Sequence, residues 1–303
     1  MSRLQKKFFQ GLVKRFSEVY IHATGGLGNQ LFQYNFAHLA SSLLGEKVTI
    51  LFEDSSTHEF PRGNEISEIA KHCTHNISIK KNSKILFLVR IFDSIRYRTG
   101  LADRSQREKE FINQLLFSKK SFQDRPPFIV QGASQDWRLV NLGFSLFKDE
   151  IAHWLASIDL GEAAESICRE KFQLMHIRRG DYSLNPDSWG LLSLEYYKQT
   201  IDNELRTIIV TDDLEVVNDL HQNFPSAKIF SPAELDQLQT IKLMSLSTKI
   251  TVANSSFSWW GARFAHEHSG AESIFPDRWF KNSDAPPNLI GDPSNSYNKA
   301  IFE

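Results

Sequence analysis

The second half of the sequence alternates short apolar segments with longer amphipathic ones, and this alternation constrains the fold more than any other feature. The predicted strands are 172–177, 207–211, 227–230, 249–253 and 273–275, and the helices between them are 194–205, 214–223, 236–246 and 257–266. A strand, a helix and a second strand form the repeating unit of a parallel sheet covered by helices. The second half is therefore predicted to be an α/β domain.

The beginning of the sequence shows the same unit once. A strand at 19–23 leads into a glycine-rich turn, a helical pattern runs to Leu44, and another strand follows at 47–52. Residues 54–125 are polar, basic and irregular with helical patches, 128–131 is a further strand, 147–155 and 161–171 are helices, and the tail from Asn282 is a loop. A chain of 303 residues is long enough for two domains. We place their boundary between residues 150 and 151.

Composition excludes several classes of protein. Hydrophobic residues make up 41% and charged residues 23% of the chain, which suits a globular enzyme rather than a disordered protein. No apolar run reaches the roughly 18 residues of a membrane span. The two cysteines, Cys73 and Cys168, do not suggest a disulfide framework and favour a reducing compartment.

The net charge of −1 hides a basic first half and an acidic second half. Residues 1–150 hold 22 Lys and Arg against 15 Asp and Glu, and residues 151–303 hold 13 against 21. Such a basic region is usually a solvated face, but it also suits an anionic lipid or a phosphorylated substrate. Residues 1–16 mix basic and apolar side chains, so they either lie on a membrane surface or pack on the protein. We expect no nucleic-acid partner.

The turn from Gly25 to Gly28 joins a predicted strand to a predicted helix. Gly26 and Gly28 would let the backbone approach a ligand closely, and a helix N-terminus favours anions. A dinucleotide fingerprint would need a third glycine where Leu31 stands, and a P-loop would need Gly-Lys-Ser/Thr. The turn is therefore either a donor-binding loop or only a tight connection.

A second polar motif, His176-Ile177-Arg178-Arg179-Gly180-Asp181-Tyr182, ends a predicted buried strand. In open α/β sheets this end of a strand faces the ligand crevice. Because buried arginines need partners, Arg178 and Arg179 either hold an anion or pair with Asp181 in a loop. The planar fork of a guanidinium suits a pyrophosphate.

Candidate metal ligands are sparse. Asp212 and Asp213 follow the predicted strand 207–211, but neighbouring side chains of an extended chain point to different sides. Capping the helix 214–223 is the more typical role for at least one of them. His266-Glu267-His268 lacks the zinc-protease spacing, and no Cys/His cluster occurs. We therefore predict no metal site and no cofactor.

A third motif, Asn254-Ser255-Ser256-Phe257-Ser258, follows the strand 249–253 and opens a helix. Hydroxyl groups and unpaired amides at a helix N-terminus form a natural seat for phosphate. One Ser or Asn is enough for a cap, so three hydroxyls and an amide indicate a ligand. We assign Trp259 and Trp260 to packing.

Taken together, these motifs resemble a known family. Gly-Gly-Leu-Gly-Asn-Gln-Leu-Phe-Gln-Tyr, the His176 motif, Leu-Ser-Leu-Glu-Tyr-Tyr, Leu-Met-Ser and Ala-Asn-Ser-Ser-Phe-Ser-Trp-Trp-Gly-Ala occur in that order. The set spans about residues 19–281 and resembles the bacterial α-1,2-fucosyltransferases of glycosyltransferase family 11. Gln131-Gly132 with Gln135-Asp136 resembles a diverged strand-end motif of the first half.

The resemblance implies a GT-B-like fold, in which two Rossmann-like domains with parallel sheets face each other across a cleft. Residues 1–150 would form the acceptor side and residues 151–303 the GDP-sugar-binding side. Arg178 would hold the β-phosphate and act with Asn29 as a catalytic residue, while His176 would contact the nucleotide. The other implied donor contacts are Gly26, Gly28, Asp212, Asn254, Ser255, Ser256, Phe257 and Ser258, with Asp181 and Arg179 as structural support.

The implied reaction is inverting transfer of L-fucose from GDP-fucose to the 2-hydroxyl of a terminal galactoside, without an obligatory metal. The acceptor would be a galactose-terminated glycan, free or lipid-linked, met in the cytoplasm at the inner face of the plasma membrane. Thr240 stands where the family often has an acid, which would shift purine recognition to Asp236, and Trp189-Gly190 replaces a common His-Gly near the acceptor. The alternatives are another GDP-6-deoxyhexose as donor, or a non-catalytic glycan- or nucleotide-binding protein.

Overall fold

The computed structural model describes residues 19–44, 47–52, 64–71, 76–81, 87, 129–131, 135–282, 291–293 and 295–303. The chain divides into two compact units, Met1–Ala152 and His153–Glu303. Each unit contains a parallel sheet, so the predicted α/β class is confirmed. The arrangement of the two sheets across a cleft stays a prediction. The N-terminal segment 1–18 and most of 54–125 lie outside the described residues.

The second unit is a doubly wound sheet with the strand order β10-β9-β8-β5-β6-β7, and all neighbouring strands are parallel. Its strands are β5 (Phe172–Ile177), β6 (Arg206–Thr211), β7 (Lys228–Phe230), β8 (Lys249–Thr251), β9 (Glu272–Pro276) and β10 (Ser296–Asn298). The chain runs outward from β5 to β7 and then returns to the other side of β5 with β8. The order therefore reverses between β5 and β8, which is where ligands bind in such sheets.

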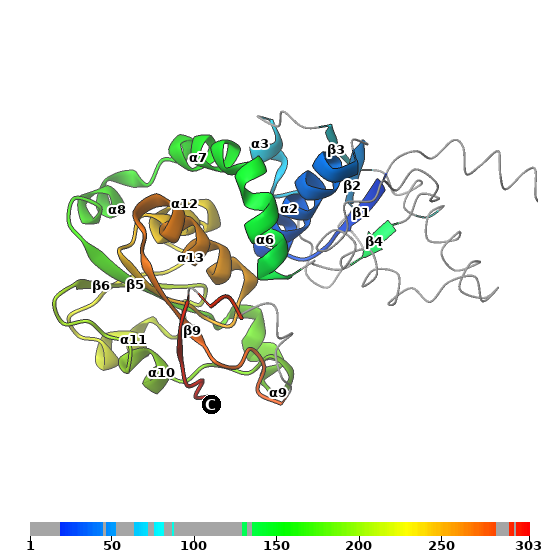
Figure 1. Ribbon diagram of the computed structural model, residues 1–303. Coiled ribbons are helices and arrows are strands. Elements are labelled where there is room, and N and C mark those ends of the chain that lie inside the picture. The colour runs from blue at the N-terminus through cyan, green and yellow to red at the C-terminus, as the bar shows by residue number, and fades with distance from the viewer. Residues whose placement is uncertain are drawn as a thin grey trace, which may run out of the picture. The chain divides into compact units, whose positions relative to one another are not determined.

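Helices cover both faces of this sheet. They are α8 (Gly161–Ile167), α10 (Leu194–Lys198), α11 (Val217–Asn223), α12 (Gln237–Ser245) and α13 (Ser256–Ser269). Figure 1 shows α12 and α13 on one face and α10 and α11 on the other. Met175 and Ile177 of β5 pack with Tyr196 of α10 and Leu220 of α11. Side chains alternate along a strand, so Leu174 and His176 are directed to the α13 face, where the His176 ring contacts Phe257.

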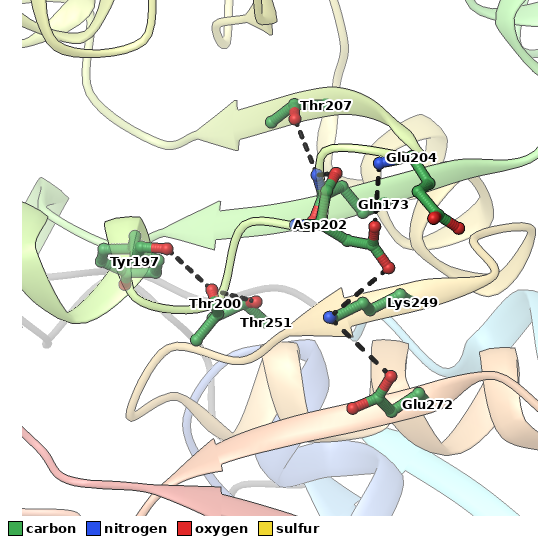
Figure 2. A network of polar contacts seen from close by, with 9 residues as sticks. All are labelled: Gln173, Tyr197, Thr200, Asp202, Glu204, Thr207, Lys249, Thr251 and Glu272. Carbon is green, nitrogen blue, oxygen red and sulfur yellow. Dashed lines mark hydrogen bonds and ion pairs between the residues drawn. The ribbon is translucent and has the colours of Figure 1, made fainter.

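The amino ends of the strands are closed by a polar network, shown in Figure 2. Gln173, Thr207, Lys249 and Glu272 occupy one row across four neighbouring strands. The Gln173 Nε2 atom donates to the Asp202 carbonyl at 2.6 Å and to the Thr207 hydroxyl at 2.8 Å. Lys249 lies 3.9 Å from Asp202 and 3.8 Å from Glu272. These groups pair with one another across the sheet, which is the pattern of a structural edge.

The first unit has the strand order β3-β2-β1-β4, again all parallel. Its strands are β1 (Val19–Ala23), β2 (Val48–Phe52), β3 (Ile77–Lys81) and β4 (Ile129–Gln131), and its helices include α2 (Leu27–Leu44), α3 (Ser67–Ala70) and α6 (Trp137–Gly143). Helix α2 packs on α6, where the Asn35 Nδ2 atom donates to the Leu139 carbonyl at 3.0 Å. The switch in strand order falls between β1 and β4.

Several predicted elements differ from the observed ones. The β3 strand lies in a region predicted to be irregular, and β10 lies in the tail predicted to be a loop. Both are edge strands with mixed polar and apolar residues, so they lack the apolar pattern of central strands. Helices α8, α10 and α11 are shorter than predicted, and α6 was not predicted. The predicted helix 147–155 is present as α7 (Lys148–Ser157). Among the described residues, none of the helices is both long and apolar enough to cross a membrane.

Candidate active site

The three polar motifs of the second half meet at the carboxyl ends of β5, β6 and β8. Arg178 directly follows β5, Asp212 directly follows β6, and Asn254 stands just beyond β8. Because β5 pairs in parallel with both β6 and β8, the segments after these strands leave the same edge of the sheet. The sheet topology therefore places the motifs around the switch point.

Arg178 is held by two carboxylates and an aromatic ring. Its Nη1 atom lies 2.6 Å from the Asp212 carboxylate and its Nη2 atom 2.5 Å from that of Asp181. The guanidinium carbon lies 5.3 Å from the centre of the Tyr182 ring. Burial would lower the pKa of Arg178, but attraction to Asp212 and Asp181 outweighs it and raises the pKa. Its Nε atom is buried without a hydrogen-bond partner among the described residues, so donor capacity remains for an anion.

Asp212 holds the loop that follows β5 through two contacts, one with the Arg179 backbone and one with the Arg178 side chain. Its Oδ1 atom accepts a hydrogen bond from the Arg179 amide at 2.7 Å, while Oδ2 pairs with Arg178. A Cβ atom on Gly180 would lie 2.2 Å from the Asp212 Oδ2 atom, so a larger residue there would displace the carboxylate that holds Arg178 and the Arg179 amide. Burial raises the pKa of Asp212, and the charge of Arg178 opposes this shift. The predicted direct contact of Asp212 with a donor is untested.

The prediction that Asp212 or Asp213 caps the next helix is wrong in detail. Helix α11 begins at Val217, and its N-cap residue, Val216, offers no side-chain hydrogen bond to the described backbone. Asp213 instead accepts a hydrogen bond from the Glu215 amide at 2.8 Å and closes the turn that precedes the helix. Asp212 pairs with Arg178 instead of capping α11, because the charged guanidinium lies beside this partly buried carboxylate whereas the helix begins five residues further along the chain.

The two neighbouring arginines have different partners. Arg179 is buried, and its Nη2 atom lies 2.6 Å from the Glu303 carboxylate. Arg178 pairs with Asp181, which is the ion pair that the sequence left open as the alternative to anion binding. The supporting role that the resemblance implies for Asp181 stays a prediction. Arg179 therefore anchors the loop to the C-terminal segment, while Arg178 remains at the switch point.

His176 is a buried, neutral base beside Arg178. Its exposed fraction is 2%, and burial, with a smaller contribution from the charge of Arg178, lowers its pKa from 6.5 to about 3. Its ring lies 5.7 Å from that of Phe257 in an edge-to-face arrangement. The Nδ1 atom is buried and has no hydrogen-bond partner in the described part of the chain. An unpartnered buried nitrogen is costly and is typical of a site that a ligand completes.

The N-terminus of α13 faces the same switch point. Ser255 occupies the N-cap position with extended backbone angles, yet its side chain caps none of the described amides of the helix. Ser256 and Phe257 are partly exposed in the first turn. Ser258 has another task, because its fully buried hydroxyl accepts a hydrogen bond from the Ala253 amide at 3.0 Å. The first turn of this 14-residue helix can therefore receive an anion.

Asn254 connects the loops around the site. Its Nδ2 atom donates to the carbonyls of Trp189, Gly190 and Trp279 at 3.0, 3.1 and 3.0 Å. Its own carbonyl accepts a hydrogen bond from the Tyr182 hydroxyl at 3.0 Å. The side-chain amide of Asn254, which the resemblance assigns to binding of the GDP-sugar, thus positions the loops at Trp189 and Trp279. The sequence named Tyr182 as part of the His176 motif and Trp189 as a departure from the family pattern, but it did not predict their contacts with Asn254, because these join segments that are far apart in the chain.

The glycine turn of the first unit is built around Asn29. Gly25, not Gly26 or Gly28, has a positive φ of 75°, and a Cβ atom there would lie 2.2 Å from the Asn29 side chain. The Asn29 Oδ1 atom accepts a hydrogen bond from Gln135 at 2.7 Å. The turn after β1 and the segment after β4 are thus linked at the switch point of this unit. The expected reach of Asn29 towards the donor stays a prediction.

Two further expectations concern carboxylates. Asp236, proposed above for purine recognition, caps α12 and forms a reciprocal capping box with Gln239. In the parts of the chain that the structure describes, no group of three His, Cys, Asp or Glu side chains could hold a metal ion.

The fold and the site define an α/β protein whose doubly wound sheet presents a guanidinium, a neutral imidazole and a helix N-terminus at its ligand crevice. No family model matches the chain. It is 25% identical to the O-antigen biosynthesis glycosyltransferase WbnK of Escherichia coli, covering 86% of this chain and 95% of the relative. It is 26% identical to an α-1,2-colitosyltransferase of Escherichia coli, covering 88% and 94%.

Both relatives match over nearly their full length, and they support a glycosyltransferase. Among solved structures, the fucosyltransferase NodZ from Bradyrhizobium aligns with 81% of this chain and 93% of its own, at 12% identity and a TM-score of 0.46. At this level of similarity we base the description of the fold on the strand order of the two sheets alone.

Proposed function

We propose that this protein is an inverting, metal-independent glycosyltransferase that moves L-fucose from GDP-fucose to the 2-hydroxyl of a terminal galactoside during surface-glycan synthesis. The observation that carries the proposal is the meeting of Arg178, His176 and the first turn of α13 at the β5–β8 switch point. The two relatives, an O-antigen glycosyltransferase and an α-1,2-colitosyltransferase, support the glycan acceptor and the α-1,2 linkage.

The proposed mechanism depends on stabilising the leaving group. Breaking the bond between C1 of the sugar and the pyrophosphate places negative charge on GDP while the sugar becomes oxocarbenium-like. A preorganised guanidinium and helix N-terminus can stabilise this charge without reorganising. Arg178 is preorganised because Asp212 and Asp181 each hold one of its terminal nitrogens. The remaining N–H groups of Arg178 and the amides of the first turn of α13 would then donate hydrogen bonds to the leaving pyrophosphate.

His176 would bind the donor as a neutral group. Its pKa of about 3 keeps it uncharged at neutral pH, so it offers one hydrogen-bond donor and one acceptor rather than a positive charge. A neutral imidazole suits a hydroxyl of the nucleotide or of the sugar. We assign no general base for the acceptor hydroxyl, since a largely dissociative transfer needs only a weak one.

Another GDP-6-deoxyhexose is the second candidate donor. One of the relatives is named for colitosyl transfer, which favours a test with GDP-colitose beside GDP-fucose. The acceptor domain would be the first unit, where uncharged Asn29 and Gln135 side chains meet at the switch point. Membrane contact through residues 1–18 stays a proposal, because that segment lies outside the described residues.

The test is a transferase assay with GDP-fucose, GDP-colitose and GDP-mannose against a panel of β-galactosides, with the new linkage mapped by NMR. We expect an α-1,2-linked product from GDP-fucose, with and without EDTA. Preferred transfer from GDP-colitose would instead favour the second donor. A folded protein that neither binds GDP nor transfers or hydrolyses any of these donors would overturn the proposal.

A further inference from the structure

Trp189 is a half-exposed aromatic residue at the rim of the candidate active site. It ends the short helix α9 (Pro186–Trp189), in the connection from β5 to α10, and 42% of its surface is exposed. Its indole stacks on the Tyr182 ring at 5.6 Å with an interplanar angle of 22°. Phe280 packs against it at 5.9 Å. Part of the Trp189 surface therefore remains exposed beside these two ring contacts.

The backbone around Trp189 is held firmly. The buried Asn254 side chain donates hydrogen bonds to the carbonyls of Trp189 and Gly190. Gly190 has a φ of 75°, and a Cβ atom there would lie 2.7 Å from Phe302, so the turn is fitted against the C-terminal segment. An isolated antiparallel β-bridge between Leu192 and Phe302 also joins the segment after Gly190 to the C-terminal segment. A ring held in this way loses little entropy when it binds a ligand.

The aromatic cluster of Trp189 and Tyr182 extends to Arg178, which we propose holds the β-phosphate. Tyr182, on which Trp189 stacks, also lies against the Arg178 guanidinium and donates to the Asn254 carbonyl. Trp189 is therefore separated from Arg178 by one ring. If Arg178 holds the β-phosphate, the group nearest to it in the donor is the sugar, since the base is separated by another phosphate and a ribose. The acceptor hydroxyl must also reach that sugar.

We propose that Trp189 is a stacking platform for the apolar face of a saccharide ring in the reaction, from either the donor sugar or the acceptor. The proposal rests on the proposed function. The C–H face of a hexose packs on an aromatic ring, while its hydroxyls remain available to polar groups and water. The site offers this chemistry beside charged groups that suit the diphosphate.

The test compares Trp189→Leu, which keeps apolar packing on Tyr182 but removes the aromatic face, with Trp189→Phe, which retains a ring. Tyr297→Leu is the matched control, because Tyr297 is 40% exposed and lies on the edge strand β10, three strands away from β5. Calorimetry gives the Kd of GDP and of GDP-fucose, and initial rates give the KM of a β-galactoside acceptor.

We expect Trp189→Leu to leave the Kd of GDP unchanged and to weaken either GDP-fucose or the acceptor by about tenfold, with Trp189→Phe recovering most of the loss. A loss in the Kd of GDP-fucose identifies the donor sugar, and a loss in the acceptor KM alone identifies the acceptor. Unchanged values for both, or an equal loss for GDP and GDP-fucose, would overturn the proposal. Failure of wild-type protein to bind GDP would instead refute the proposed function.

Discussion

Replacing Arg178 by methionine tests whether its guanidinium stabilises the leaving pyrophosphate or only neutralises Asp212. Methionine retains an unbranched apolar stem but removes both ion pairs, at 2.6 Å to Asp212 and 2.5 Å to Asp181. If Arg178 stabilises the leaving group, the turnover number should fall by about 10²–10³, the usual loss for one such donor. The assay is GDP release in the presence of an acceptor.

The same substitution should also lower stability, because Asp212 is only 23% exposed and would lose its counter-ion. Removing one partner of a buried ion pair costs roughly 3–5 kcal/mol, but partial exposure of both side chains screens this pair. We therefore expect a loss of about 2 kcal/mol, which lowers the melting temperature by about 4–8 °C. We expect the Arg179 amide, which donates to Asp212 in the wild type, to limit this loss in the variant.

A second substitution separates the two roles. Asp212→Asn has nearly the same shape, keeps an acceptor for the Arg179 amide and removes the unpaired charge. The double variant Arg178→Met/Asp212→Asn should regain most of the lost stability but none of the lost turnover. Recovery of turnover in the double variant, or a turnover in Arg178→Met within tenfold of wild type, would refute the assignment of Arg178 to the leaving group.

Three further predictions concern pH, a turn and metal ions. Because the folded pKa of His176, about 3, lies below the unfolded value of 6.5, the unfolded chain gains a proton first as the pH falls. Through this group the wild type should lose about 2 kcal/mol of unfolding free energy between pH 7 and pH 5. Urea denaturation should show that His176→Asn lacks this loss, and equal losses would contradict the burial argument. Gly190→Ala should lower the melting temperature more than Gly270→Ala, since Phe302 crowds Gly190 whereas no atom lies within 4 Å of a Cβ at Gly270; the reverse ranking would refute the crowding. EDTA should leave the transferase rate unchanged, and loss of activity that Mn²⁺ restores would end the metal-independent mechanism.

Local sequence patterns predict the central elements of the fold well. The strands β1 and β5 have the predicted bounds, and the predicted helix that follows β1 ends at Leu44 as α2 does. Central strands are buried on both faces, so their residues form apolar runs that are visible without tertiary information. The strands β3 and β10 escape this reasoning, because each pairs with a single neighbouring strand among the described residues and polar residues are tolerated at such an edge.

The candidate site could be located but not assembled from the sequence. Motifs at strand ends indicate the crevice, since parallel strands place their carboxyl ends at one edge. The sequence does not show that Asp212 pairs with Arg178 instead of capping a helix, or that Asn254 holds the turn at Trp189. Both outcomes depend on partners from other segments of the chain.

The sequence by itself determined the strand–helix alternation and the chemical groups at the strand ends, because periodicity and burial act over a few neighbouring residues. Only the tertiary structure decided which of these groups pair with one another and which remain open to a ligand. Strand order sets the distances between the loops, and hydrogen bonds and ion pairs form only over a few ångströms. Asp212 and Ser258 are therefore engaged within the protein, whereas the Nδ1 atom of His176 remains without a partner among the described residues.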